Sequence, residues 1–524
     1  MTSSPPSPWA PRVDWRRDLD LSRDGLLLRV VDALAGLARR ALRGVGLLPV
    51  GDTERPFDVP EHALLGLGPR LGALGSYAFF AAVDEWAKER GVGVARFSLG
   101  PRTRHFYVRD RAAAEEVLAN FRVFDFYSQD RMFGLLLPVG GHRSFFRNRV
   151  KKHANQEAEA SAVHGPALGR VAALVAADWE RLLDASDAAR ITVDLTPVAS
   201  RVTVDGVLTA FVGLPAERAD ALAQESRGCA ASLAAYIGRR KAGTLPFTLY
   251  WGLGALLWEN REFERTRARL RSVIEAATAE ERGASKDLFV ATAKTELEGG
   301  EFSFLKEIMG LVIAGSETTS RAFAFAVWEL AQRPDLQLRV LDELRAAAPG
   351  LAADEPASFD HVAEMHLLHR VVDETLRLFP PLYLLKRDVL ADVALAGVPV
   401  PKGSFVWTSP LFLHRDAAAF RDPHSFDPDR PELLRYSDAG WDGPAGPARR
   451  WTEDVSAGDA ASWVFGRGLK FCPGRRFARL EMELVLLELL RRFEFAGARP
   501  LSGLREGFAL MPTEPLLVDV RRRA

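Results

Sequence analysis

The stretch FGRGLKFCPG, residues 465–474, decides the fold because it places a cysteine in a glycine-rich turn directly before a predicted helix. The two glycines before the cysteine, Gly466 and Gly468, permit a tight turn and the close approach of a flat ligand. Pro473 suits the first position of the helix that we expect over 473–492. The sulfur of Cys472 then lies at a helix N-terminus, where unpaired backbone N–H groups favour the thiolate, the form that binds metal. The turn therefore predicts a metal-binding thiolate.

A second motif, AGSETT at residues 314–319, lies on a long helix that the hydrophobic pattern predicts over 302–333. The small residues that open it leave space in mid-helix and let the backbone distort. Glu317 and Thr318 follow, and adjacent positions lie about 100° apart around a helix axis. One of the two side chains can therefore face a ligand while the other faces solvent.

Taken in order along the chain, these stretches resemble the cytochrome P450 family. The same resemblance covers the helical pair Glu374 and Arg377, which is followed by the stretch FDPDR ending at Arg430. It extends from about Tyr77 to the end of the chain. It implies a mostly α fold with small β-sheets, in which haem b lies between the long oxygen-side helix and the cysteine-loop helix, with Cys472 as the iron ligand.

The resemblance also implies roles for individual residues. Thr318 and Glu317 would be the catalytic pair that assists oxygen activation, and Glu374, Arg377 and Arg430 would form a buried charge network bracing the thiolate loop. Haem contacts are expected from Phe465, Gly466, Lys470, Gly474, Arg387, His142, Ala314 and Gly315.

Two of the expected propionate contacts depart from the family pattern. Lys470 stands where relatives carry Arg or His, and lysine keeps the charge but loses the bidentate fork. Relatives often have an arginine four residues after the position of His142, whereas this chain has Phe146 there, with Arg147 beside it. Between the two basic candidates on that helix, we favour His142.

The reaction that the resemblance implies is insertion of one dioxygen atom into a hydrophobic small molecule, by hydroxylation or epoxidation, in secondary metabolism. Electrons would come from a separate ferredoxin or flavodoxin with its reductase, because no flavin- or iron–sulfur-binding region is attached. Two alternatives stay open: a haem-thiolate enzyme that uses peroxide or needs no oxygen, and a haem-based sensor. The first kind commonly lacks the acid and threonine pair, and a sensor would not need Thr318.

A hydrophobic substrate would contact four segments. Their apolar residues do not distinguish one class of apolar ligand from another. Each segment could equally be part of the ordinary hydrophobic core. The segments are Phe121 to Phe133, the face of Leu311 and Ala314, Leu382 to Leu385, and Phe508 to Met511.

The chain divides into an N-terminal extension, residues 1–60, and one domain over 61–524. Residues 26–50 form an amphipathic pattern interrupted by charges, which predicts a helix packed on the domain, with peripheral membrane contact as the alternative and no transmembrane segment. The insert at 433–458 is rich in Pro and Gly. Helices are expected over 77–90, 112–120, 142–160, 165–184, 197–213, 216–238, 254–282, 302–333, 334–348 and 473–492, and strands within 93–98, 105–108 and 389–410.

Composition narrows the partners and the compartment. Lys plus Arg and Asp plus Glu each number 69, so net charge offers no reason to expect nucleic acid. With only two cysteines a disulfide framework is excluded, which favours the cytoplasm, and Cys229 reads as a small buried hydrophobe. The spacing of His361, His366 and His369 matches no zinc site, and we expect a solvated helix face.

Overall fold

The structure is a computed structural model, and it describes most of the chain after residue 75. Residues 1–75, His142, Lys470 and nearly all of the 433–458 insert lie outside the described part. The described residues are 76–98, 104–125, 157–186, 189–214, 258–278, 304–352, 355–431, 460–467 and 474–523, with positions 225, 228, 229, 232, 233, 433 and 472.

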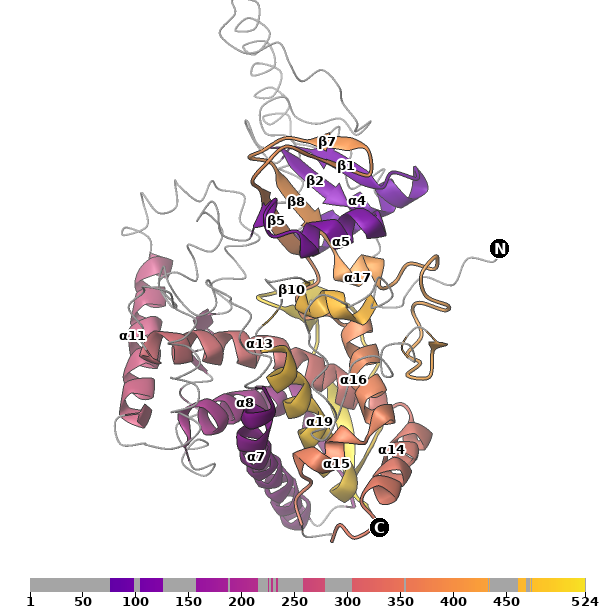
Figure 1. Cartoon of the computed structure of the whole chain (residues 1–524). Coiled ribbons are helices and arrows are strands. Elements are labelled where there is room, and N and C mark those ends of the chain that lie inside the picture. The colour runs from indigo at the N-terminus through magenta and orange to yellow at the C-terminus, as the bar shows by residue number, and fades with distance from the viewer. Residues whose placement is uncertain are drawn as a thin grey trace, which may run out of the picture.

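A five-stranded sheet lies at one end of the described part, with strand order β1-β2-β8-β5-β3 (Figure 1). Strand β2 runs parallel to β8, and the other neighbours are antiparallel. Helix α4 packs on one face through Phe79 and Phe80, while α5 packs on the opposite face through Ala114 and Val117. The elements are α4 (Ser76–Glu89), β1 (Val94–Phe97), β2 (His105–Val108), α5 (Arg111–Ala119), β3 (Phe124–Asp125), β5 (Leu385–Val389) and β8 (Phe405–Thr408).

Three smaller sheets are antiparallel. Ala396 and Gly397, both with positive φ of 46° and 79°, form the tight turn between β6 and β7. In the sheet with strand order β4-β12-β9, β12 pairs with β4, which lies more than 300 positions earlier in the sequence. The bounds are β4 (Ile191–Asp194), β6 (Val393–Leu395), β7 (Val398–Val400), β9 (Phe493–Ala496), β10 (Leu504–Glu506), β11 (Leu510–Pro512) and β12 (Leu517–Arg522).

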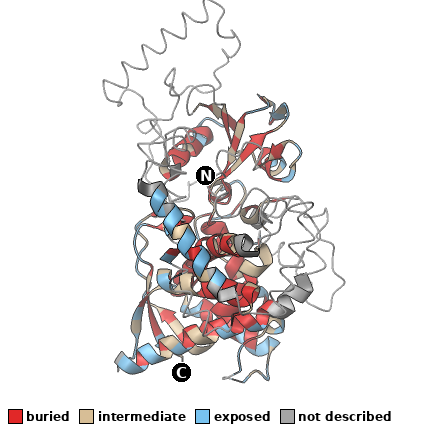
Figure 2. Cartoon of the chain, turned by 90° about the vertical axis from the view of Figure 1, so that its left-hand side faces the viewer, coloured by how far each residue is buried: buried red, intermediate tan, exposed pale blue. Residues whose placement is uncertain are grey.

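Helices form the rest of the described part, and α13 and α19 lie at its centre (Figure 1). Helix α13 packs along α8, and α19 packs along α7. Both central helices are almost wholly buried, whereas α11 is mostly exposed (Figure 2). The bounds are α7 (Glu157–Ser186), α8 (Leu195–Val207) with a π-helical turn (Leu208–Val212), α11 (Trp258–Thr278), α13 (Phe304–Leu330), α14 (Pro334–Ala347), α15 (Phe359–Ala363), α16 (His366–Leu378), α17 (Pro410–Leu413), a 3₁₀ turn (Ala460–Phe465) and α19 (Arg475–Arg492).

The predicted fold class, mostly helix with small sheets, is confirmed, and α13, α14, β1 and β2 match their expected ranges closely. The predicted break between residues 160 and 165 is wrong, because α7 is continuous from Glu157 to Ser186 and contains Pro166. A proline inside a helix removes one backbone hydrogen bond and crowds the preceding turn. Packing outweighs that cost here, since α7 lies along α19 and Gly165 fits closely against Phe359 of α15. The expected helices over 142–160 and 216–238 fall largely outside the described residues.

Within the described residues, one helical segment, Leu195–Val212, is long and apolar enough to cross a membrane. It spans α8 and the π-helical turn, and 67% of it is buried inside the protein. Because α8 packs along α13, this segment is accounted for as a core helix.

Glu481 on α19 is fully buried against α8, and neither carboxyl oxygen has a hydrogen-bond partner among the described residues. Gly206 makes the room for it, because a Cβ there would lie 2.0 Å from Glu481 Oε1. Burial, together with the nearby Asp205, raises the pKa of Glu481 well above its ordinary value of 4.5. The side chain therefore keeps its proton in the folded protein at pH values where the unfolded chain has lost it.

This proton predicts a pH dependence of stability. Because the folded state binds a proton that the unfolded chain releases near pH 4.5, the free energy of unfolding falls as the pH rises above that value. Glu481→Gln should remove this part of the fall, measured by urea unfolding between pH 5 and 9. Glu262→Gln, on the exposed helix α11, is the control. Parallel pH profiles for the parent protein and Glu481→Gln would contradict the prediction.

Candidate active site

The cysteine loop is closed by its backbone. The amide of Cys472 donates a 2.6 Å hydrogen bond to the carbonyl oxygen of Phe465, so the two ends of the loop are held side by side. Gly466 turns the chain immediately after Phe465, with a left-handed φ of 73° that favours glycine. Its amide donates to the carbonyl of Trp463 at 3.1 Å, which ties the loop to the preceding 3₁₀ turn.

Cys472 lies three residues before the start of α19, so the expectation that the helix begins at position 473 is corrected to Arg475, with Gly474 as its N-cap. The amide of Arg475 still donates to the carbonyl of Cys472 at 3.3 Å, which joins the loop to the helix. A Cβ on Gly474 would sit 3.9 Å from Cys472 Sγ, so the glycine leaves space beside the sulfur. Cys472 is partly exposed, whereas α19 is buried from Arg479 to Leu490.

Helix α13 carries a stripe of partly exposed residues in its otherwise buried middle. The stripe consists of Leu311, Ala314, Gly315 and Thr318, at the spacing that places side chains on one face of a helix. Val312 and Ile313, between them, are buried. The pattern marks a face of the central helix that its neighbours leave uncovered. An apolar face of this kind suits a flat hydrophobic group.

Gly315 also serves helix packing, which sequence reasoning had not anticipated. A Cβ at Gly315 would lie 3.0 Å from Val207 Cγ2 on α8, so glycine lets the two helices approach closely. Thr203, one turn earlier on α8, lies with its hydroxyl 3.2 Å from the carbonyl oxygen of Ser316. The position of the AGSETT segment therefore depends on α8.

Thr318 and Glu317 occupy different surroundings on α13. Thr318, on the stripe, donates its hydroxyl proton to the carbonyl of Ala314 at 2.7 Å. Glu317 was expected to face solvent, yet it is only 7% exposed and pairs with Arg321 at 3.0 Å. The physical reason is that other elements pack against α13 on several sides. A side chain one residue from the stripe, about 100° around the helix axis, therefore meets another packed surface.

Arg387 on β5 is buried and pairs in register with Val406 of β8. One guanidinium nitrogen donates to the carbonyl of Lys386 at 2.9 Å. This placement puts a buried positive charge in the five-stranded sheet. The other two basic residues expected at the haem, His142 and Lys470, lie outside the described residues, so their roles stay predictions.

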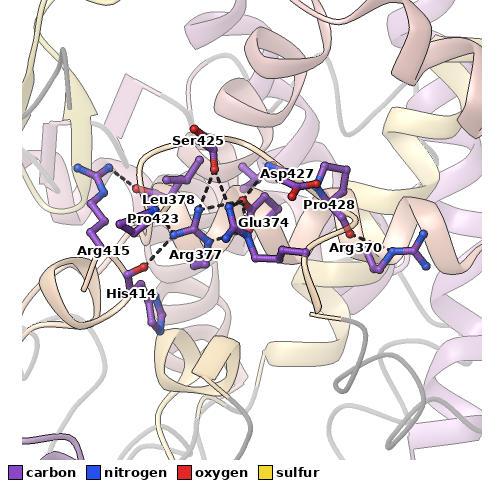
Figure 3. A network of polar contacts seen from close by, with 12 residues as sticks. Arg370, Glu374, Arg377, Leu378, His414, Arg415, Pro423, Ser425, Asp427 and Pro428 are labelled. Carbon is purple, nitrogen blue, oxygen red and sulfur yellow. Dashed lines mark hydrogen bonds and ion pairs between the residues drawn. The ribbon is translucent and has the colours of Figure 1, made fainter. Parts of the chain in front are cut away.

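Glu374 and Arg377 lie in one buried network (Figure 3). Arg430 belongs to the same network. Arg377 donates two parallel hydrogen bonds of 2.7 and 2.8 Å to the carboxylate of Glu374, and Arg430 Nε donates to Glu374 Oε1 at 2.9 Å. The backbone amide of Asp427 donates to that same oxygen at 2.9 Å. All three charged side chains are at most 1% exposed.

The network also orders the irregular segment that follows α17. The remaining donors of Arg377 reach the carbonyls of His414 and Pro423 at 2.8 and 2.7 Å. Both guanidinium groups donate to the carbonyl of Ser425. Buried charges are stable only when paired and fully hydrogen-bonded, and this arrangement meets that requirement.

The expectation for the histidines was partly wrong. His369 is 3% exposed and its Nδ1 lies 2.9 Å from Glu483 on α19, so it belongs to the core. His361 caps the short helix α15, with Nδ1 accepting from the amide of Ser358 at 3.1 Å. The described residues contain no group of three or more His, Cys, Asp or Glu side chains that could hold a metal.

Comparison with known proteins identifies the family. A sequence profile of the family Cytochrome P450 matches residues 68–518. The chain belongs to the cytochrome P450 family. It is similar to Cytochrome P450 3A11 of Mus musculus, 34% identical over 214 residues, which is 40% of this chain and 38% of that protein. Cytochrome P450 3A5 of Homo sapiens is 33% identical over 217 residues (40% and 38%), and Cytochrome P450 3A9 of Rattus norvegicus is 31% identical over 269 residues (51% and 48%). These alignments span less than half of each relative.

Cytochrome P450 proteins bind haem b through a cysteine thiolate, and the described residues fit that group. Cys472 offers a partly exposed sulfur at the approach to a helix N-terminus. The partly exposed stripe of α13 offers an apolar face without large side chains near Ala314 and Gly315. Arg387 adds a buried positive charge suited to a carboxylate.

The Glu374 network predicts a large cost for removing its central charge. Glu374→Gln leaves two buried guanidinium groups without their carboxylate, and breaking a buried pair costs about 3–5 kcal/mol. We expect a loss of that order in the free energy of unfolding, measured by urea denaturation. Asp342→Asn, which breaks an exposed pair with Arg345, should change stability by less than about 1 kcal/mol. Equal effects of the two substitutions would refute the prediction.

Proposed function

We propose that this chain is a haem-thiolate monooxygenase in which the sulfur of Cys472 is the proximal ligand of the haem iron. The observation that carries the proposal is the closed backbone loop, Cys472 to Phe465, which presents a partly exposed sulfur beside Gly474. When bound, haem with a thiolate ligand supplies activation of dioxygen and cleavage of its O–O bond. One oxygen atom enters an apolar substrate, and the other leaves as water after two electrons and two protons are delivered.

In this proposal, residues of helix α13 deliver the protons that the reaction needs. Thr318 presents a hydroxyl from the partly exposed stripe; it donates its own proton to Ala314 O, and its oxygen can accept a hydrogen bond, so it relays a proton by giving up its own as it receives another. Glu317 lies one residue away on a different side, held by Arg321. When the pair with Arg321 opens, the Glu317 carboxylate can relay a proton between the outside of the stripe and the Thr318 hydroxyl.

The identity of the iron ligand can be tested directly. Purified protein reconstituted with haem b, reduced and treated with carbon monoxide should show the red-shifted Soret band typical of sulfur ligation. Cys472→Ser should lose this band, whereas Cys229→Ser should keep it, because Cys229 is a buried thiol on another segment. A parent protein without the band, or a Cys472→Ser protein with it, would overturn the proposal.

The AGSETT motif favours the monooxygenase over the peroxide-using, oxygen-independent and sensor alternatives. Thr318→Ala removes the hydroxyl that lies on the stripe, so NADPH consumption should continue while product formation falls several-fold. Thr319→Ala is the matched control, because Thr319 is buried on another side of the same helix. Product formed per NADPH is the measurement, and unchanged coupling in Thr318→Ala would support one of the alternatives.

A hydrophobic small molecule is the substrate class that the surroundings support. One of the four expected contact segments, Phe508 to Met511, is bonded to the residue just before another, since the amide of Leu510 donates to the carbonyl of Pro381 at 2.8 Å. This bond places the hairpin of β10 and β11 beside residues 382–385. Leu311 and Ala314 lie on the stripe. Of the segment Phe121 to Phe133, residues 121–125 are described.

Electrons come from a separate protein in this proposal, with a ferredoxin or a flavodoxin and its reductase as the expected donors. Supplying each donor, and a reductase that carries two flavins, to the reconstituted protein would identify which one supports product formation. The cytoplasmic location, peripheral membrane contact and the place in secondary metabolism stay predictions.

A further inference from the structure

A second buried charge cluster joins α16 to α19, the helix that follows the cysteine loop. Arg479 on α19 forms an ion pair with Asp373 on α16, in which Nη1 contacts Oδ1 and Nη2 lies 3.3 Å from Oδ2. Nη2 also lies 3.5 Å from Glu483 Oε1, one turn along α19. His369, one turn before Asp373, closes the cluster by its contact with that same Glu483 oxygen. All four residues are at most 6% exposed.

The cluster is electrically balanced when His369 carries a proton. Two carboxylates face one guanidinium, so the imidazolium supplies the second positive charge. Burial alone would lower the pKa of His369, but the adjacent Glu483 carboxylate raises it above its ordinary value. Burial raises the pKa of Asp373, and Arg479 opposes that rise by favouring the charged form.

Asp373 is the immediate neighbour of Glu374, and the two carboxylates bind different parts of the protein. Glu374 holds Arg377, Arg430 and the irregular segment through Ser425 and Asp427. Asp373 holds α19 instead. Two adjacent residues thus attach α16 to different parts of the protein. Of the two, Asp373 is the one that contacts α19, the helix that follows the cysteine loop.

Arg479 is also the first buried side chain that the structure describes after Cys472. Residues 474–478 are partly exposed, and no side chain in the described part caps the start of α19. Cys472 is connected to this helix by the bond from the Arg475 amide to its carbonyl. Movement of the start of α19 therefore reaches Cys472, and Arg479, about one turn into the helix, is the first described buried residue after Cys472 whose contacts oppose such movement.

We propose that Arg479 is a positioning residue that sets the place of the Cys472 sulfur by fixing α19 to α16 through Asp373. This inference rests on the proposed function, because it takes Cys472 as the iron ligand. Supporting groups behind a metal ligand typically contribute about 10- to 100-fold to metal affinity or activity. The forked contact to Asp373 matters as well as the charge, since lysine could supply only a point charge.

The test uses the haem-loaded protein in urea too dilute to unfold it. The measurement is the rate at which the reduced carbon monoxide complex loses its thiolate-type Soret band, with far-ultraviolet circular dichroism recording global unfolding. We expect Arg479→Met and Asp373→Asn each to speed this loss about tenfold, and Arg479→Lys to lie between Arg479→Met and the parent. Arg345→Met, from an exposed ion pair, should match the parent.

The outcomes separate this inference from the proposed function. A parent without the thiolate band overturns the proposed function and this inference with it. A parent with the band, together with a parent-like rate in Arg479→Met and Asp373→Asn, overturns this inference alone. Loss of the band only in step with global unfolding also overturns it, because the role of Arg479 is then general stability. Should Arg479→Met fail to fold, Arg479→Lys and Asp373→Asn carry the test.

Discussion

The carboxylate of Glu374 is the point on which the described core depends. It sits at 0% exposure and accepts hydrogen bonds from Arg377, Arg430 and the amide of Asp427. An ionised carboxylate buried without partners would cost many kcal/mol, so the segments that bring these donors must assemble together. The irregular stretch between α17 and residue 430, which has little regular hydrogen bonding of its own, is ordered by the same group. Helix α16 thus organises loops as well as helices.

Elements with a local cause were predictable from the sequence. Helix α14 begins at Pro334 as expected, since proline suits the first turn of a helix, and α13 follows its hydrophobic pattern within a few residues. The cysteine turn was predictable in outline because glycine at position 466 signals a left-handed residue. The meeting of Glu374 with Arg430, 56 positions apart, came from family resemblance, because periodicity carries no information about such a contact.

What could not be predicted depends on tertiary packing. From local sequence alone, Pro166 is expected at a helix boundary. The helix α7 nevertheless continues through it, because α7 packs along its neighbours. Glu317 looked exposed because a helical wheel shows direction but not what lies there, and the side chain proved buried beside Arg321. The Arg479 cluster was missed for a similar reason. Its i to i+4 spacing with Glu483 was visible in the sequence, but the partner Asp373 lies 106 positions away.

The five-stranded sheet has a consequence for how the molecule is made. The pairings of β1 with β2 and of β5 with β8 are local, but β3 pairs with β5 and β2 joins β8 in parallel over far longer separations, and Trp407 Nε1 donates to His105 Nδ1 across 302 positions. During synthesis the N-terminal strands must therefore wait, with an edge unpaired, until most of the chain has left the ribosome. Long-range pairing of this kind raises contact order and slows folding, and unpaired edges favour aggregation. Truncations that remove β8 should thus be poorly soluble even where the helices are complete.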